Sequence, residues 1–253
     1  MRRCQNARYR HKFQRELQTF PAFFDGLLPE EAQRGGAARA LGIALQNSFA
    51  LLAALGGDVA GALSLVPQSE VGAHIGAREL SPRLSEGAAL SAADLAALVV
   101  DLPQRPMLAG IEGRPRLSLA GAQPKLPLVR LASGGLRVPL SLDGGTEAST
   151  HILKPEPAAL PGLVANEALI MRLASDIGLS VAHVDVVQAG ERPCLLVTRY
   201  DRTAAGMRLH QEDFAKGSVL CPSINMIPGC AIFSVLFGRT LARSRGMCSH
   251  CST

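Results

Sequence analysis

The spacing of apolar and polar residues divides the chain into regions of different periodicity. Over residues 19–104, apolar residues recur at helical spacing in an alanine-rich background, which predicts a small helical module. Ser91 and Asp94 have the spacing of a capping box and predict a helix over 95–101. The apolar run 59–67 follows the turn residues 56–58 and predicts either an edge strand or a buried connector.

Residues 106–214 change to short apolar runs separated by glycine-containing turns, which predicts a mixed β-sheet. The turn at 189–192 joins two of these runs and predicts a hairpin. One longer segment, 163–177, has helical spacing and ends at Gly178, which suits the C′ position of a helix. We therefore predict an α+β fold with one main helix and strands over 116–120, 125–130, 136–140, 151–154, 184–188 and 194–199.

The predicted main helix carries a carboxylate on its apolar stripe. The residues that recur at steps of three and four, and are expected to face the sheet, are Leu163, Glu167, Ile170, Ala174 and Ile177. A carboxylate buried on such a face is costly unless a cation pairs with it. Lys154, at the end of the strand expected over 151–154, is the cation expected within reach. The alternative is that Glu167 reaches solvent at the helix rim and Lys154 is a solvated strand end.

Small residues occupy the turn between the strands expected over 116–120 and 125–130. The segment reads Ser118, Leu119, Ala120, Gly121, Ala122, Gln123, Pro124 and Lys125. Side chains this small let backbone N–H groups approach a polyphosphate closely. On its own, the segment is also compatible with an ordinary small-residue hairpin. The strand end at 197–202, where apolar residues give way to charged ones, is likewise on its own merely a strand end.

The basic balance of the chain comes from its two ends. The net charge is +5, of which residues 1–18 carry +5 and residues 216–253 carry +4, so the middle carries −4. The middle shows no basic groove with interleaved aromatic residues, so we expect no direct binding of nucleic acid. The longest apolar run, 226–238, is too short for a membrane span, which takes roughly 20 residues, and no apolar signal core follows the basic start. We expect a cytoplasmic protein that does not associate with membranes.

Residues 216–253 contain four of the six cysteines and neither Asp nor Glu. Periodicity and turn signals lapse together there, which favours a divergent, frameshifted tail over a natural domain. The alternative is a zinc site built from Cys221, Cys230, Cys248, His250 and Cys251. Cys248 and Cys251 have the spacing of paired zinc ligands, whereas eight residues separate Cys221 from Cys230.

Five motifs follow one another along the chain. They are 117–125 (Leu-Ser-Leu-Ala-Gly-Ala-Gln-Pro-Lys), 151–155 (His-Ile-Leu-Lys-Pro), 166–167 (Asn-Glu), 199–202 (Arg-Tyr-Asp-Arg) and 209–213 (Leu-His-Gln-Glu-Asp). Together they resemble the HipA family of serine/threonine kinase toxins from type II toxin–antitoxin systems. Upstream, 23–30 and 49–63 are similar to the family's N-terminal subdomain. The resemblance implies a partial N-terminal subdomain over 19–105 and a nucleotide-binding domain like a kinase N lobe over 106–215, between a basic head, 1–18, and the tail, 216–253.

The resemblance also implies an activity, cofactors and a partner. The family uses ATP and Mg²⁺ to phosphorylate a serine on a protein target, and its partner is a small DNA-binding antitoxin. Carried over to this sequence, the phosphate loop is Ala120, Gly121, Ala122, Gln123 and Lys125; the nucleotide lysine is Lys154, with Glu167 to orient it; and the adenine-proximal strand is Thr198, Arg199 and Tyr200. Ser118 matches the serine that such kinases autophosphorylate, and about two negative charges there would oppose ATP binding.

Two departures from the family pattern limit what the chain is expected to do. The basic head replaces the family's first strands, and it is either an unstructured or misassigned start or an electrostatic arm for DNA or the antitoxin. Phosphoryl transfer also needs an Asp, an Asn and a magnesium-binding carboxylate, which the resemblance places in a C lobe. After Asp213 the chain has no Asp or Glu, and Asn225 has no acidic neighbour. We therefore assign no catalytic or metal-binding residue and expect a chain without its C lobe to be inactive alone. The alternatives are a non-catalytic fragment that binds ATP or the antitoxin, and a split enzyme completed by a second chain.

Overall fold

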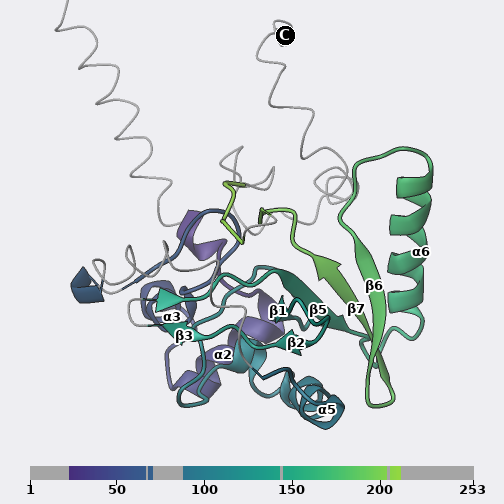
Figure 1. Cartoon of the computed structure of the whole chain (residues 1–253). Coiled ribbons are helices and arrows are strands. Elements are labelled where there is room, and N and C mark those ends of the chain that lie inside the picture. The colour runs from purple at the N-terminus through teal and green to yellow at the C-terminus, as the bar shows by residue number, and fades with distance from the viewer. Residues whose placement is uncertain (1–22, 67, 71–87, 143–144, 204–205, 212–253) are drawn as a thin grey trace, which may run out of the picture.

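The computed structural model of the chain describes residues 23–66, 68–70, 88–142, 145–203 and 206–211. Short helices of the N-terminal part lie beside a curled sheet, and a longer helix stands at the far edge of that sheet (Figure 1). The basic head, the tail with its candidate zinc ligands, and the pair Glu212 and Asp213 lie outside the described residues.

Two short helices form the core of the N-terminal part. Helix α2 runs over Glu31–Leu41 and helix α3 over Ser48–Leu55. The side chain of Asn47 caps α3 by accepting a hydrogen bond from the Ala50 amide, while α2 ends at Gly42 in the left-handed region. Burial of aliphatic side chains holds these helices together, and the buried members of this core are Leu27, Leu28, Ala37, Ala38, Leu51, Leu52, Leu55, Val59 and Ala109.

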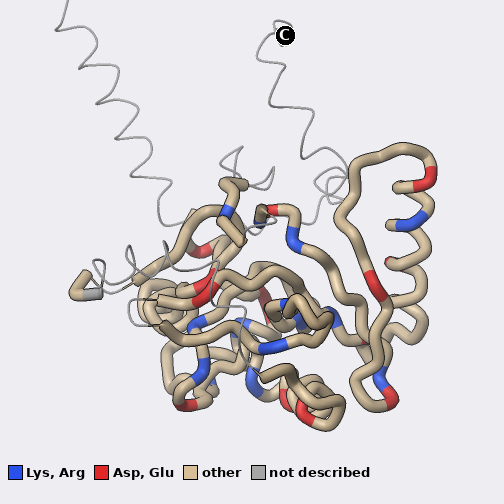
Figure 2. The backbone as a smooth tube through the Cα atoms, viewed as in Figure 1, with Lys and Arg blue, Asp and Glu red and all other residues tan. Residues whose placement is uncertain are grey.

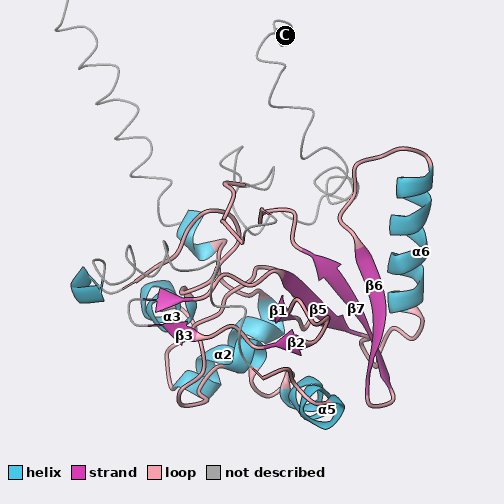
Figure 3. Ribbon diagram, viewed as in Figure 1, coloured by secondary structure: helices cyan, strands magenta, loops and turns pink. Residues whose placement is uncertain are grey.

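The second part is built on a five-stranded antiparallel sheet in the order β2-β1-β5-β7-β6 (Figure 3). Its strands are β1 (Leu126–Arg130), β2 (Leu136–Arg137), β5 (His151–Pro155), β6 (Val184–Ala189) and β7 (Arg192–Thr198). The central strand, β5, pairs with β1 on one side and with β7 on the other. A separate short ladder joins β3 (Ser141–Leu142) to β4 (Gly145–Thr146).

Two helices contact the sheet. Helix α5 (Ala92–Asp101) lies against β6, and helix α6 (Leu163–Asp176) contacts β6 and β7. The capping box predicted for α5 is confirmed, because Ser91 Oγ accepts from the Asp94 amide and the Asp94 carboxylate accepts from the Ser91 amide. Two single 3₁₀ turns, η1 (Gln68–Glu70) and η3 (Pro106–Leu108), complete the described elements. Within the described ranges, no helix has the length and hydrophobicity needed to cross a membrane.

The mixed α and β architecture is confirmed, but two predicted strands are wrong in extent. The predicted strand at 116–120 contributes a single parallel bridge, from Leu117 to Asp58, and the one at 136–140 ends at Arg137. The hairpin is confirmed, with Gly190 in the left-handed region between β6 and β7. Of the two alternatives for 59–66, the connector is correct, since Val59 is fully buried and no strand forms there.

Helix α6 is rotated relative to the stripe predicted from its sequence. Val164 and Ala174 are buried, whereas Ile170 and Ile177 of the predicted stripe are 53% and 69% exposed. Glu167 lies at the edge of the inward face, with its side chain 33% exposed. Apolar residues surround this helix on most sides, so their spacing did not define which side faces the sheet.

Candidate functional site

An ion pair joins the central strand to the long helix. Strand β5 places Lys154 one residue before its end, and α6 places Glu167 in its second turn. The Nζ atom of Lys154 lies 2.7 Å from Oε1 of Glu167, and both side chains are partly buried. The expected pairing is therefore present, and the alternative of a solvated strand end is wrong. Since the lysine is held by one partner, the direction of its ammonium group is fixed.

The small-residue loop folds back on itself through Lys125. The Nζ atom of Lys125 donates a hydrogen bond to the carbonyl oxygen of Ala120 at 2.6 Å. Gly121 lies beneath this side chain with φ of 105°, and a Cβ there would meet the same Nζ at 2.6 Å. The backbone conformation therefore favours glycine at this position, and any larger residue would also displace the Lys125 ammonium group.

The environment of Lys125, including the charge of Lys154, affects its pKa. Burial and the positive charge of Lys154 together lower the pKa of Lys125 to about 8, against the opposing attraction of Glu30 and Glu167. The protonated form is thus poorly compensated by the carboxylates around it. An anion placed between the loop and β5 would supply the missing negative charge.

Two buried polar atoms near the lysines also lack partners. Nε2 of Gln123 and Oε2 of Glu167 are buried without a hydrogen-bond partner in the described part of the chain. An unpaired donor in the same loop as Lys125 suits the phosphate oxygens of a nucleotide. The magnesium ion that the family resemblance implies fits less well. Within the described ranges, no group of three or more His, Cys, Asp and Glu side chains could hold a metal ion.

The loop is attached to the N-terminal part at two points. Ser118 is completely buried, and its Oγ donates to the carbonyl oxygen of Leu27 at 2.7 Å. Three residues further along, the carbonyl oxygen of Gly121 accepts from the Glu30 amide at 3.4 Å. The predicted autophosphorylation of Ser118 therefore requires this serine to leave its place beneath Leu27.

The three residues of the strand end predicted to lie near adenine have different environments. The Thr198 amide donates to His183, and the Arg199 amide donates to Thr150, so both amides serve the sheet and its margin. The guanidinium of Arg199 is 1% exposed and points into a buried cluster of charges, not toward the lysine pair. Tyr200 is 64% exposed. The side chain of Arg199 is thus engaged inside the protein, which sequence analysis did not foresee.

This buried cluster, here called the Asp58 cluster, consists of two aspartates and three arginines: Asp58, Asp201, Arg199, Arg202 and Arg208. Asp58 comes from the N-terminal part, and the other four follow β7. The shortest ion pairs are Arg199 to Asp201 at 2.6 Å and Arg208 to Asp58 at 2.8 Å. Such charges are stable away from water only when every one is paired and hydrogen-bonded.

The pKa values within the Asp58 cluster show how strongly its members are coupled. Burial alone raises the pKa of Asp58, but Arg199, Arg208 and Arg202 together hold it below its ordinary value. Burial and the neighbouring Arg199 lower the pKa of Arg202 to about 10, against the pull of both aspartates. Sequence analysis missed the cluster, because the charged motif 199–202 and the turn 56–58 were each noticed but nothing in the sequence connects them.

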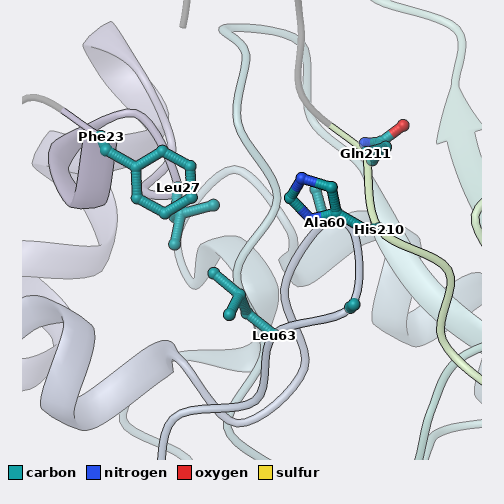
Figure 4. A pocket seen from close by; sticks show the side chains of 7 residues that line it. Phe23, Leu27, Ala60, Leu63, His210 and Gln211 are labelled. Atoms are coloured by element: carbon teal, nitrogen blue, oxygen red, sulfur yellow. The ribbon is translucent and has the colours of Figure 1, made fainter. Parts of the chain in front are cut away.

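A shallow hollow lies away from the lysine pair. Figure 4 shows it between the N-terminal segment and residues near the end of the described chain. Its lining residues are Phe23, Leu27, Ala60, Ala62, Leu63, His210 and Gln211. None of the lysine site's charged groups lines it. Figure 2 shows acidic and basic residues interspersed along the described chain, with no long stretch of one sign.

Fold and site together define a protein of mixed α and β structure, in which Lys125 of a small-residue loop and Lys154 of the central strand of an antiparallel sheet lie close enough to affect each other electrostatically. Two sequence profiles of one family match this chain: the HipA N-terminal domain over residues 3–66 and the HipA-like C-terminal domain over residues 117–221. The chain belongs to the HipA family. The first match begins at residue 3, inside the head that sequence analysis left unassigned.

Known proteins of this family resemble the chain over most of its length. The protein named "Putative kinase Y4mE" of Sinorhizobium fredii is 51% identical over 77% of this chain and 45% of its own length. The serine/threonine-protein kinase toxin HipA of Shewanella oneidensis is 37% identical over 71% of this chain and 37% of its own length. A solved complex of HipA, HipB and operator DNA from Shewanella oneidensis aligns with a TM-score of 0.59 and 32% identity, over 81% of this chain and 45% of that one. The chain thus spans less than half the length of these relatives.

Proposed function

We propose that the chain is the nucleotide-binding part of a HipA-type serine/threonine protein kinase and that it binds ATP. The pair of Lys154 and Glu167 supports this most directly. In protein kinases, a strand lysine contacts the nucleotide phosphates and a glutamate on the neighbouring helix holds it in place. The structure has a lysine and a glutamate in that relation, on β5 and α6.

The remaining contacts follow from the loop. Ala120, Gly121 and Ala122 offer backbone close to the phosphates, Gln123 offers its unpaired amide, and Lys125 offers a second ammonium group. The strand end at 198–200 then lies near adenine, although the amides of Thr198 and Arg199 already donate within the protein. This arrangement corresponds to an N lobe, and the proposed C lobe is the part of the relatives' length that this chain does not match.

Phosphoryl transfer to a protein serine is the reaction that the family relationship suggests. It needs a base that accepts the hydroxyl proton and carboxylates that hold magnesium. The described residues contain no metal-binding group of acids, and the sequence has no Asp or Glu after Asp213. We infer that this chain alone holds ATP without transferring its phosphate. By analogy with the HipA and HipB complex, its partner in the cytoplasm is a DNA-binding antitoxin.

The proposal is tested by isothermal titration of ATP, with magnesium in the buffer, into the chain and into Lys154→Ala. We expect the wild type to bind and the variant to lose roughly tenfold or more in affinity, because a charge-assisted contact is removed. Arg130→Ala is the matched control, since Arg130 is also a cation in an ion pair on the sheet, 2.8 Å from Asp185 but outside the site.

Equal affinity in the wild type and Lys154→Ala, with both folded by circular dichroism, would contradict the proposed site. A transfer assay with radiolabelled ATP and a generic protein substrate tests the inferred lack of turnover. We expect no labelled protein with the wild-type chain. Labelling that Lys154→Ala abolishes would show that the chain transfers phosphate by itself.

A further inference from the structure

Asp58 contacts three segments that lead into the candidate nucleotide site. Its backbone forms a parallel bridge with Leu117: the Asp58 amide donates to Arg116 at 2.9 Å and its carbonyl accepts from the Ser118 amide at 3.0 Å. The phosphate loop begins two residues later, at Ala120. The backbone of Asp58 therefore fixes the strand that leads into the loop.

The carboxylate of Asp58 holds the other two segments. Its Oδ2 accepts hydrogen bonds from the amide and the hydroxyl of Ser149, which stands two residues before β5, the strand of Lys154. Its two oxygens also pair with Arg199 and Arg202, which follow the end of β7. Asp58 thus contacts the segment before the phosphate loop, the segment before β5 and the segment after β7.

Close packing leaves the turn that carries Asp58 little freedom. A Cβ at the preceding Gly57 would lie 2.8 Å from the carbonyl oxygen of Arg116. On the other side, the Gly61 amide donates to Asp201 at 2.7 Å, and the carbonyl oxygens of Val59 and Gly61 accept from Arg202 at 3.1 Å. The turn is therefore held from both flanks by residues that belong to the sheet part.

These contacts cross the boundary between the two family domains. Asp58 lies in the segment that matches the HipA N-terminal domain, whereas Leu117, Ser149 and the three arginines lie in the segment that matches the HipA-like C-terminal domain. The contact of Ser118 with Leu27 crosses the same boundary. The N-terminal domain thus reaches the candidate site through named hydrogen bonds.

We propose that Asp58 is a positioning residue of the nucleotide site, through which the N-terminal domain sets the phosphate loop in register with the lysine strand and the strand end. This inference rests on the proposed ATP binding. It adds that affinity for ATP depends on a residue that does not touch the nucleotide and that comes from the other domain.

The test compares ATP affinity, with magnesium present, in the full chain and in Asp58→Asn, at a temperature where circular dichroism shows both folded. The substitution leaves three arginines against one aspartate. A second variant, Asp58→Asn with Arg208→Met, restores the wild-type excess of one positive charge but still lacks the carboxylate. We expect both to lose roughly tenfold or more in affinity, since an uncoupled loop must be ordered by the ligand itself.

Leu51→Ala is the matched control for a general loss of stability. Leu51 is fully buried in the N-terminal core, and its apolar side chain is not a member of the Asp58 cluster. We expect its ATP affinity to remain within about twofold of the wild type, because a cavity in that core lowers stability without moving the loop. If Leu51→Ala loses as much affinity as the Asp58 variants at equal stability, the proposal is overturned.

A measurement on the wild type keeps the proposal testable even if neither Asp58 variant folds. Amide hydrogen exchange is followed over residues 57–61 with and without ATP and magnesium. We expect ATP to slow exchange there, because ordering the loop strengthens the bridge to Asp58. If the wild type binds ATP but exchange at 57–61 is unchanged, the proposal fails, whether or not the variants fold. If the wild type does not bind ATP, it is the proposed function that fails.

Discussion

The position of Lys125 shows how a single side chain can couple ligand binding to protonation. Its Nζ atom donates a hydrogen bond to the carbonyl oxygen of Ala120. Burial and the positive charge of Lys154 lower its pKa to about 8. A phosphate favours the protonated form and so raises this pKa on binding. Binding of the ligand is therefore accompanied by uptake of a proton where the pH lies between the pKa of the free protein and that of the complex.

ATP affinity is accordingly expected to depend on pH in one direction. Below pH 8, Lys125 is protonated in the free protein and the affinity is constant. Above pH 8, affinity falls, by up to about tenfold per pH unit, until the pKa of the complex is reached. Titration calorimetry between pH 6.5 and 9.5, in buffers of different ionisation enthalpy, measures both the affinity and the proton uptake.

Two substitutions at the same position separate charge from shape in this experiment. Lys125→Arg keeps a cation at every pH used, so its affinity should stay flat above pH 8. Lys125→Met has no proton to gain, so its affinity should be low and equally flat. A wild-type affinity that does not change between pH 7 and 9.5 would contradict a role for this lysine in binding.

At the scale of elements, helix α6 has an apolar side without a partner among the described residues. Its outward side chains Leu169, Ile170, Leu173 and Ile177 are between 53% and 69% exposed. Apolar surface of this kind promotes association between molecules in water. Glu167 lies at the sheet side of the same helix, so α6 provides both the carboxylate of the candidate site and an exposed apolar surface that promotes association.

Replacing Leu169 by Glu and Leu173 by Lys together should reduce self-association and leave the fold intact. The two positions are exposed and one helical turn apart, so the new charges form a favourable pair worth about 0.3 kcal/mol. Light scattering over a range of protein concentrations measures association, and thermal unfolding measures stability. Ser175→Lys adds charge on the same helix without removing apolar surface, and it should scatter like the wild type. Equal scattering by all three proteins would show that this face does not drive association.

Local signals explain which elements could be predicted from the sequence. The capping box at Ser91 and the glycine turn at 189–192 act within a few residues, and both were predicted correctly. The predicted strand at 116–120 failed because only Leu117 finds a partner, and that partner, Asp58, is distant in sequence. The prediction of which face of α6 meets the sheet was wrong because leucine and isoleucine occur on nearly all sides of this helix.

The same distinction applies to the candidate site. Lys154 and Glu167 were paired correctly because they are only 13 positions apart, near the end of a strand and in the second turn of the next helix. The Asp58 cluster joins Asp58 to Arg202 and Arg208, which are 144 and 150 positions away, and no local pattern reports such a contact. Arg199 was expected on the strand next to adenine, and the burial of its side chain with Asp201 became visible only in three dimensions.

At the scale of the whole molecule, acid is expected to weaken the fold at both of its parts. The pKa values of Asp58 and Asp201 in the cluster, and of Asp25 beside Arg34, all lie below their ordinary value of 3.8. For carboxylates with lowered pKa, the stabilisation is complete above the unfolded value and is lost as pH falls toward the folded one. The contribution of these carboxylates to the free energy of unfolding should therefore be constant above pH 5 and decrease below pH 4.

Urea unfolding followed by circular dichroism at pH 3, 4, 5 and 6 measures this loss. Each affected carboxylate contributes up to about 1.4 kcal/mol per pH unit to the slope below pH 4. Asp25→Asn removes one of them without touching the buried cluster, so its slope should be shallower than that of the wild type. Equal stability of the wild type at pH 3 and pH 6 would show that these pairs do not stabilise the fold.

The Asp58 cluster also limits how such a chain can evolve. A change at Asp58 alone leaves three buried arginines facing a single aspartate, and a change at one arginine leaves backbone oxygens of the opposite domain without their donor. Substitutions at these positions are therefore expected to be tolerated mainly in pairs, in which the aspartate and an arginine change together. Recombination that joins an N-terminal domain from one lineage to a sheet domain from another is therefore expected to succeed only where both parents carry matching charges at this boundary.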